Sequence, residues 1–353
     1  MCRMYRGSRV ASRTNEGGLM LRRISAILII LGGLALIILP VTEHVWSGAG
    51  PANTMINSFK PVMTQSAMAA VGSDLQQLGA ANTQLSTQVM PMLGSQLHLT
   101  PAQLQGALAS NFSSVATGMA QLPGILKHFQ GMGALMAGQV ANFQAASTIP
   151  MSGVPMTVLP WGFALVGVLA VAFGLMMLIG KAKAPAIAAL VLGLVVVGSS
   201  LALSFPHKAV SADHMITALR PVMTAQSATE MGQSLGVVGA MVNQMETQMI
   251  PYVATQLQMT PAAFNQMLGT QFPAVATALK NMPTTAATFS GMQAKISSNL
   301  NNYAQAAAIP SMTFLVWLFV GVGALCILGG AAGLGGATET KREEAKSSSS
   351  IPA

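Results

Sequence analysis

"PVMT" stands at residues 61–64 and again at residues 221–224, which is 160 positions later. Shifting the chain by 160 positions aligns residues 51–150 with residues 211–310 without a gap. In that alignment 34 of the 100 paired positions are identical, several-fold more than unrelated sequences would give. Because internal repeats decide how the rest of a chain is read, we interpret this sequence as one unit that is written twice.

The composition is typical of a membrane protein. Of the 353 residues, 52% are hydrophobic and only 7% are charged, and the mean hydropathy is +0.56. An ordinary soluble domain carries about 25% charged residues. Four long stretches lack any charged residue or histidine, and a helix needs about 20 apolar residues to cross the hydrocarbon layer. We therefore predict four transmembrane helices, at residues 24–40, 157–180, 185–204 and 312–334.

The first apolar stretch has a second interpretation. Arg22 and Arg23 precede it, as basic residues precede the apolar core of a secretory signal peptide. However, the 160-residue shift places residues 25–40 on residues 185–200, which lie too far into the chain to be a signal. We therefore expect an uncleaved anchor. Residues 1–19 are polar and aperiodic, which makes Met20 a plausible start of the chain.

The basic residues predict the orientation of the spans, because Lys and Arg accumulate on the cytoplasmic side. Eleven of the 17 flank the spans on one side, and the other six lie in two long loops. Both termini are therefore expected in the cytoplasm and both loops outside. Trp46, Trp161 and Trp317 fall at the outer ends of spans, where amphipathic rings prefer to lie. The eleven are Arg3, Arg6, Arg9, Arg13, Arg22, Arg23, Lys181, Lys183, Lys341, Arg342 and Lys346.

The predicted organisation follows from these assignments. We expect a plasma-membrane protein with a cytoplasmic basic segment before the first span, two extracytoplasmic helical domains, a short cytoplasmic link and a disordered cytoplasmic tail. In chain order, the segments are 1–23 (basic), 24–40 (span), 41–156 (outer domain), 157–180 (span), 181–184 (link), 185–204 (span), 205–311 (outer domain), 312–334 (span) and 335–353 (tail).

Both long loops are predicted to be helical, because their apolar residues recur at spacings of three and four. Thr100-Pro101 and Thr260-Pro261 predict helix starts, since Thr caps free N–H groups and Pro suits the first helical position. Pro123 and Pro283 are expected to break the helices that follow. The fold class is therefore an all-α membrane protein with two homologous helical ectodomains. As parallel tandem repeats, these would be related by a pseudo-two-fold axis along the membrane normal.

Two pairs of residues are candidates for binding or packing. Lys60 and Arg220 form the one basic position shared by both copies, directly before the repeated Pro-Val-Met-Thr, and could contact a lipid headgroup or a partner. The alternative is a solvated or snorkelling side chain. Gly329 and Gly333 are spaced like small residues at a close helix–helix contact, and we predict helix packing there.

The sequence offers no pattern typical of catalysis or of a metal site. Met241, Met245 and Met249 share a helix face and could hold Cu(I), but their first-copy counterparts lack sulfur, so we interpret them as core residues. His207 and His214 have no carboxylate or cysteine at ligand spacing. We predict a protein without enzymatic activity, cofactor or metal.

The expected function is a scaffold or interaction role at the cell envelope of a bacterium, in which the duplicated helical ectodomain binds a protein partner or envelope lipid. The outer loops carry six basic and five acidic residues, and so nearly neutral a surface disfavours nucleic acid. We expect membrane lipids as partners, with an envelope protein or a second copy of the chain as further candidates. The alternative is a transport component, a pore or an accessory subunit with a pathway along the repeat axis. The absence of ionisable residues in the spans argues against ion coupling.

Overall fold

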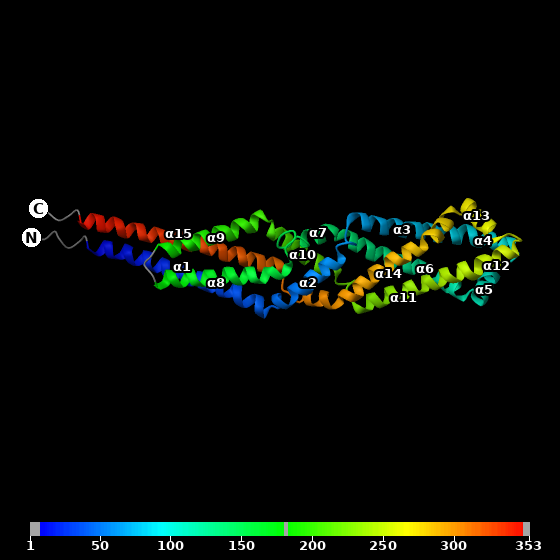
Figure 1. The fold of residues 1–353 in the computed structure, drawn as a ribbon, viewed down its shortest axis with the longest axis horizontal. Helices are drawn as coiled ribbons and strands as arrows, with labels where there is room; N and C mark the ends of the chain where they lie inside the picture. The colour runs from blue at the N-terminus through cyan, green and yellow to red at the C-terminus, as the bar shows by residue number, and fades with distance from the viewer. Residues whose placement is uncertain (1–7, 180–182, 349–353) are drawn as a thin grey trace, which may run out of the picture. The chain divides into compact units, whose positions relative to one another are not determined.

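The computed structural model describes residues 8–179 and 183–348. Within these ranges the chain is helical, with turns and no strand, as the all-α prediction requires. It divides into two compact units (Figure 1). We call one the apolar bundle (Met1–Thr54, Ala145–His214 and Ala304–Ala353) and the other the hairpin unit (Met55–Gln144 and Met215–Tyr303).

Four helices of the apolar bundle contain segments long and apolar enough to cross a membrane. The prediction of four helices that are long and apolar enough to cross a membrane is therefore confirmed. Three of the segments are Arg22–Thr42, Met156–Ile179 and Ala184–Ala202, and the fourth ends at Leu334. The helices that carry them are α1 (Ser8–Thr42), α8 (Leu159–Ile179), which follows the short η2 (Met156–Val158), α9 (Ala184–Ala202) and α15 (Met312–Ser348).

The outer surface of this bundle is hydrocarbon. Leu31, Leu165, Leu194 and Leu328 are each more than half exposed. Soluble proteins rarely expose large continuous apolar patches. A surface of this kind is consistent with a membrane protein whose helices face lipid.

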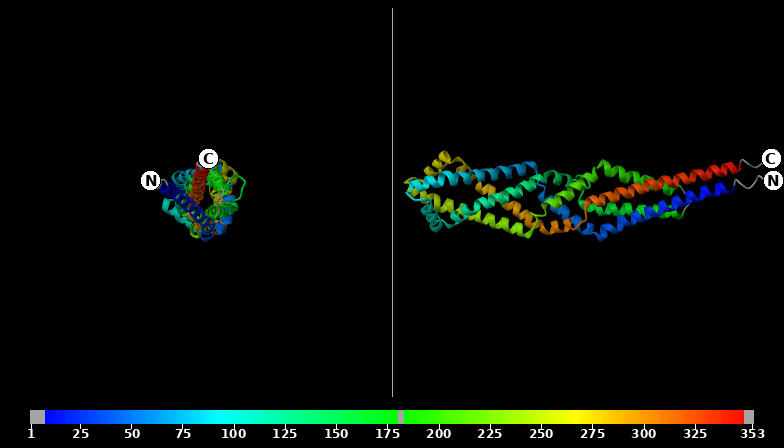
Figure 2. Two further views of the ribbon diagram at one scale, coloured as in Figure 1. Left: turned by 90° about the vertical axis from the view of Figure 1, so that its left-hand side faces the viewer. Right: turned by 180° about the vertical axis from the view of Figure 1, so that it is seen from behind.

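Glycines bring the helices of the bundle into close contact. Helix α1 packs against α8, and α9 packs against α15 (Figures 1 and 2). A Cβ atom on Gly167 would lie 2.7 Å from the carbonyl oxygen of Gly33, and a Cβ on Gly33 would lie 2.7 Å from that of Gly167. The same arrangement recurs in the second half, where a Cβ on Gly193 would collide with the carbonyl oxygen of Gly323. Small residues thus set the distance between helices, as they do in membrane bundles.

The ends of the chain differ from the expectation. Helix α15 continues to Ser348, into the segment 335–353 for which the composition predicts disorder, and α1 begins at Ser8 within the basic segment 1–23. Alanine, Glu, Lys and Arg are good helix formers, which explains why this segment can extend α15. Residues 1–7, residues 180–182, which include the first half of the link at 181–184, and residues 349–353 lie outside the described residues.

The remaining helices recur in both halves with bounds shifted by 160 residues. In the first half they are α2 (Val45–Phe59), α3 (Gln65–Gln84), the π-helical turn η1 (Leu85–Val89), α4 (Met90–Gln96), α5 (Pro101–Asn111), α6 (Ser113–Gly138) and α7 (Val140–Ala146). In the second half they are α10 (Phe205–Leu219), α11 (Ala225–Gln244), η3 (Met245–Met249), α12 (Ile250–Gln256), α13 (Pro261–Gln271) and α14 (Pro273–Ala307). The single helix α14 corresponds to both α6 and α7 of the first half.

The predicted breaks at two prolines are wrong. Pro123 lies inside α6 and Pro283 lies inside α14. An interior proline loses one backbone hydrogen bond, but tertiary packing outweighs this loss, since Leu122, Ile125 and Leu126 beside Pro123 are buried. At Pro91 the chain instead forms a π-helical turn, in which the N–H of Met90 donates to the carbonyl of Leu85 five residues earlier.

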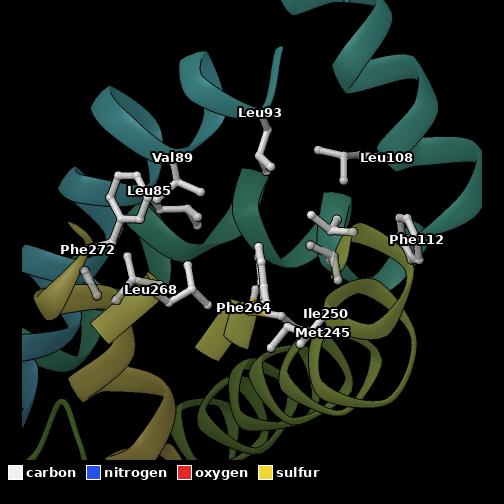
Figure 3. Packing of buried hydrophobic residues seen from close by; sticks show 14 of the residues in the cluster. Leu85, Val89, Leu93, Leu108, Phe112, Met245, Ile250, Phe264, Leu268 and Phe272 are labelled. Carbon is white, nitrogen blue, oxygen red and sulfur yellow. The ribbon is translucent and has the colours of Figure 1, made fainter. Parts of the chain in front are cut away.

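The core of the hairpin unit is built from both halves. Helix α6 packs against α3 of its own half and against α11 of the other half. Figure 3 shows Leu85 and Leu93 of the first half facing Phe264 and Ile250 of the second. The rings of Phe129 and Phe289, at equivalent positions in the two halves, stack with centroids 4.9 Å apart.

The glutamine Gln244 caps a helix of the other half. Helix α6 follows Phe112, which has no side-chain oxygen with which to cap the free N–H groups of the first turn. The N–H groups of Ser114 and Val115 donate instead to Oε1 of Gln244, at 2.8 and 3.0 Å. A residue 130 positions away in the sequence thus performs the role of a local N-cap.

The equivalent residue, Gln84, makes the reciprocal contact. The N–H groups of Ala274 and Val275, in the first turn of α14, donate to Oε1 of Gln84 at 3.0 and 3.1 Å. Each glutamine donates through Nε2 to a second glutamine one turn later, Gln88 or Gln248, which fixes the orientation of the carboxamide. The two halves are therefore joined by matching hydrogen bonds in both directions.

Replacing Gly167 with alanine should destabilise the apolar bundle, because the added methyl group would lie less than 3 Å from the carbonyl oxygen of Gly33 and from the side chain of Ile37. Alanine for Gly162 on the same helix meets no atom within 4 Å and is the matched control. There the better helix propensity of alanine should leave stability unchanged or raise it by up to about 1 kcal/mol. Thermal unfolding in mild detergent measures both, and equal stability of the two variants would contradict the packing described.

Gln84→Met should destabilise the hairpin unit by roughly 1–3 kcal/mol, because two N–H groups at the start of α14 lose their acceptor. Gln84→Glu keeps an oxygen acceptor and places negative charge at a helix N-terminus, so it should retain most of the stability. Denaturant unfolding of the full chain provides the comparison. If the two variants were equally destabilised, the capping role would be excluded.

Candidate apolar ligand site

The hairpin unit contains an apolar cavity of about 680 Å³ in its first half. It lies between η1 and α4 on one side, α5 on another and α6 on the third. Its volume is within the range of ligand pockets, roughly 300–1,000 Å³. The residues that line it are Ser86, Met90, Pro91, Gly94, Ser95, Leu99, Pro101, Leu104, Gln105, Leu108, Ala116, Met119 and Ala120.

A tight turn positions the two sides of this cavity. After α4, His98 adopts a left-handed conformation (φ 54°), and the N–H of Leu99 donates to the carbonyl of Gly94 at 2.8 Å. Helix α5 then starts at the predicted Thr100-Pro101. Its N–H of Gln103 donates to Oγ1 of Thr100, while the N–H of Thr100 donates to Oε1 of Gln103. This capping box fixes the direction in which α5 returns beside α4.

The lining is mostly hydrocarbon, and its polar side chains are two serines and the exposed Gln105. None of its residues is charged. The hydroxyl of Ser86 donates to the carbonyl of Thr83 at 3.0 Å, and that of Ser95 donates to the carbonyl of Met92 at 2.8 Å. Both hydroxyls are therefore used within their own helices. Two methionines, Met90 and Met119, add flexible walls that can adapt to the shape of a ligand.

This arrangement suits binding better than chemistry. A nucleophile or a general base needs an adjacent titratable partner, and the lining has no Asp, Glu, His, Cys or Lys. In the part of the chain that the structure describes, no three His, Cys, Asp or Glu residues gather as metal ligands. Met241 is buried against Gly118, where an added Cβ would lie 2.6 Å from its sulfur, so it fills the core between α11 and α6.

The predicted basic pair lies elsewhere. Lys60 and Arg220 are both exposed, each just after the end of its helix, and neither lines the cavity. Arg220 is hydrogen-bonded to Tyr303, whose hydroxyl donates to the carbonyl of Ile216 at 2.6 Å. Position 143, the counterpart of Tyr303, is phenylalanine, so Lys60 has no equivalent hydroxyl to bind.

The two predicted packing glycines contact neighbouring helices within the chain. A Cβ on Gly329 would lie 2.6 Å from Ile29 of α1, and a Cβ on Gly333 would lie 2.9 Å from Ala186 of α9. The two residues therefore pack against different helices rather than forming one face for a single partner.

Tyr303 has a perturbed titration. Burial raises the pKa of its hydroxyl above the ordinary value, while the hydrogen bond and the charge of Arg220 lower that pKa by less. The folded state consequently holds the phenolic proton more tightly than the unfolded state does. This contribution to stability is fully present below the unfolded pKa, about 10, and is lost as the pH rises through the folded pKa.

Comparison with known proteins adds no relative to this description: no family model matches the chain, and no curated protein matches it. The cavity must therefore be interpreted from its own residues.

Sequence reasoning did not identify the cavity. The small residues Gly94, Ala116 and Ala120 line the cavity on two of its helices, together with larger ones such as Leu104. These residues indicate a cavity only when the path of α5 beside α4 is known, because spacing along the sequence does not show which helix faces remain unpacked.

Replacing Arg220 with Gln should raise the pKa of Tyr303 further, because both effects that lower it are removed. Lys60→Gln, at the equivalent position of the first half, is the control and should leave that pKa unchanged. The absorbance of tyrosinate followed against pH measures the shift. Tyr303→Phe should abolish the corresponding titration, and a pKa unaffected by Arg220→Gln would refute the assigned contact.

Proposed function

We propose that this chain is a non-enzymatic, multi-pass protein of a bacterial plasma membrane that binds envelope lipid in its hairpin unit. The cavity between α4, α5 and α6 is the observation on which this proposal rests. It is a hydrocarbon-lined space of about 680 Å³, with no charged residue and no group suited to catalysis. Such a lining favours an apolar ligand, since a polar one would lose its hydrogen bonds with water on entry.

The proposed topology places the hairpin unit outside the cell. Eleven basic residues flank the spans on the side of the termini and the link, which argues for a cytoplasmic location of that side. Each half then leaves the cytoplasm and returns to it. The two halves would form parallel repeats about a pseudo-two-fold axis along the membrane normal, and the recurrence of helix bounds and glycine contacts supports this relation.

Lys60 and Arg220 are proposed to contribute at the membrane surface. Both are exposed and follow α2 and α10, the helices that come directly after α1 and α9 in each half. Basic side chains at such a position would attract the phosphate of a lipid headgroup, which is a contact separate from hydrocarbon binding in the cavity.

Native mass spectrometry of the full chain from mild detergent should find lipid bound to the wild-type protein. Ala116→Phe should reduce the lipid-bound fraction about tenfold or more, because a ring would occupy the cavity between α4, α5 and α6. Ala109→Phe, on an exposed position of α5 that does not line the cavity, should leave it unchanged.

Two results would contradict the proposal. One is the finding that the wild-type protein carries no lipid, either when it is purified alone or when a protein partner is purified with it. The other is solute flux through liposomes containing the purified chain, which would favour the transport alternative.

A further inference from the structure

We infer that each chain binds one lipid hydrocarbon chain, in the first half alone, and that the second half has lost the equivalent site. This inference rests on the proposed function and adds the number of ligands, the class of group bound and the residues that select it. The argument compares the two halves, whose frameworks provide a matched pair of environments within one molecule.

The frameworks of the two sites are the same. Four lining residues are identical in the second half, where Pro251, Pro261, Leu268 and Ala276 stand for Pro91, Pro101, Leu108 and Ala116. The turn is also repeated: Gln258 is left-handed (φ 55°), and the N–H of Met259 donates to the carbonyl of Ala254 at 2.8 Å. A difference in binding must therefore come from the lining side chains.

The second half carries more bulk where the first half is open. Phe264 replaces Leu104, and its ring is buried in the core that both halves share (Figure 3). Ala254 replaces Gly94 and is fully buried. In the first half, a Cβ on Gly94 would lie 3.1 Å from the carbonyl oxygen of Leu99 and 3.9 Å from Leu104, so the added methyl group takes space beside the cavity wall.

The second half also carries charge where the first half is neutral. Glu246 replaces Ser86 and Lys280 replaces Ala120, and both charged residues are exposed. In the first half these two positions line the cavity. A hydrocarbon chain placed there in the second half would strip water from a carboxylate and an ammonium group, which is unfavourable. The neutral first-half lining has no such obstacle and is complementary to an uncharged ligand.

The lining favours a lipid chain over a partner helix. None of its residues is charged, and both serine hydroxyls are used within their own helices, so the site offers no ion pair and few hydrogen bonds with which to select a partner helix. A single extended hydrocarbon chain is much thinner and can follow the space between α4 and α6, with its polar head in solvent.

The test is a titration of the full-length protein in mild detergent with monoacylglycerols of increasing chain length, followed by native mass spectrometry. The wild type should bind one molecule per chain. Because each buried methylene contributes to affinity, shortening the probe by two methylenes should weaken binding about fifteenfold.

Exchange variants between the halves supply the controls. Ser86→Glu, Leu104→Phe and Ala120→Lys together should abolish binding, since they give the first half the residues of the second. The reciprocal set, Glu246→Ser, Phe264→Leu and Lys280→Ala, should raise the stoichiometry to two. The fold already accommodates each of these residues at the equivalent position. If the first triple variant fails to fold, Ala120→Lys alone changes an exposed residue and should still weaken binding at least tenfold.

The outcomes separate the two proposals. No bound probe on the wild type overturns both the proposed function and this inference. Two bound molecules on the wild type leave the proposed function intact and overturn the inference. One bound molecule that survives the first-half triple variant, in a protein with wild-type helicity, also overturns the inference.

Discussion

Two glutamine carboxamides determine how the hairpin unit is assembled. Phe112 and Phe272 precede long helices and cannot cap them, so Gln244 and Gln84 supply the missing acceptors from the opposite half. Hydrogen bonds of this kind are worth only about 0.5–1.5 kcal/mol each, but N–H groups left unsatisfied at these partly buried helix starts cost more. The halves must therefore interlock before either has a satisfied backbone, which makes the unit a single cooperative body rather than two independent hairpins.

In the apolar bundle, the two halves repeat the same kind of contact. Gly33 and Gly167 pair across α1 and α8 as Gly193 and Gly323 pair across α9 and α15. Polar caps recur as well: Asn53 accepts from the N–H of Met156, and Asp213 at the equivalent position accepts from the N–H groups of Met312 and Thr313. Gly33 and Gly193, and likewise Asn53 and Asp213, are 160 positions apart and keep a small or an acceptor side chain in both halves, because a larger or apolar residue would break a contact that the fold needs twice.

The features that could be predicted from the sequence are those that depend on interactions between residues close together in the chain. The four long apolar helices, the helical loops and the starts at Thr100 and Thr260 depend on residues within a few positions, and the structure confirms them. The breaks expected at Pro123 and Pro283 failed because the neighbouring side chains are held in a core that local rules do not see. The glutamine caps join residues 130 to 191 positions apart, and the cavity depends on the path of α5, so neither was accessible to pattern reasoning.

Because the chain is duplicated, positions that both halves need for folding can be distinguished from positions at which only one half has a requirement. Where both halves must form the same contact, as at the capping glutamines and at Phe129 and Phe289, their residues match. Around the cavity they diverge toward bulk and charge in the second half, although the surrounding helices and turns are retained. Stability alone does not require this difference, since either set of side chains is compatible with the same backbone. A demand that acts on one half and not on the other is what a single ligand would impose, and the first-half cavity is where the residues leave room for it.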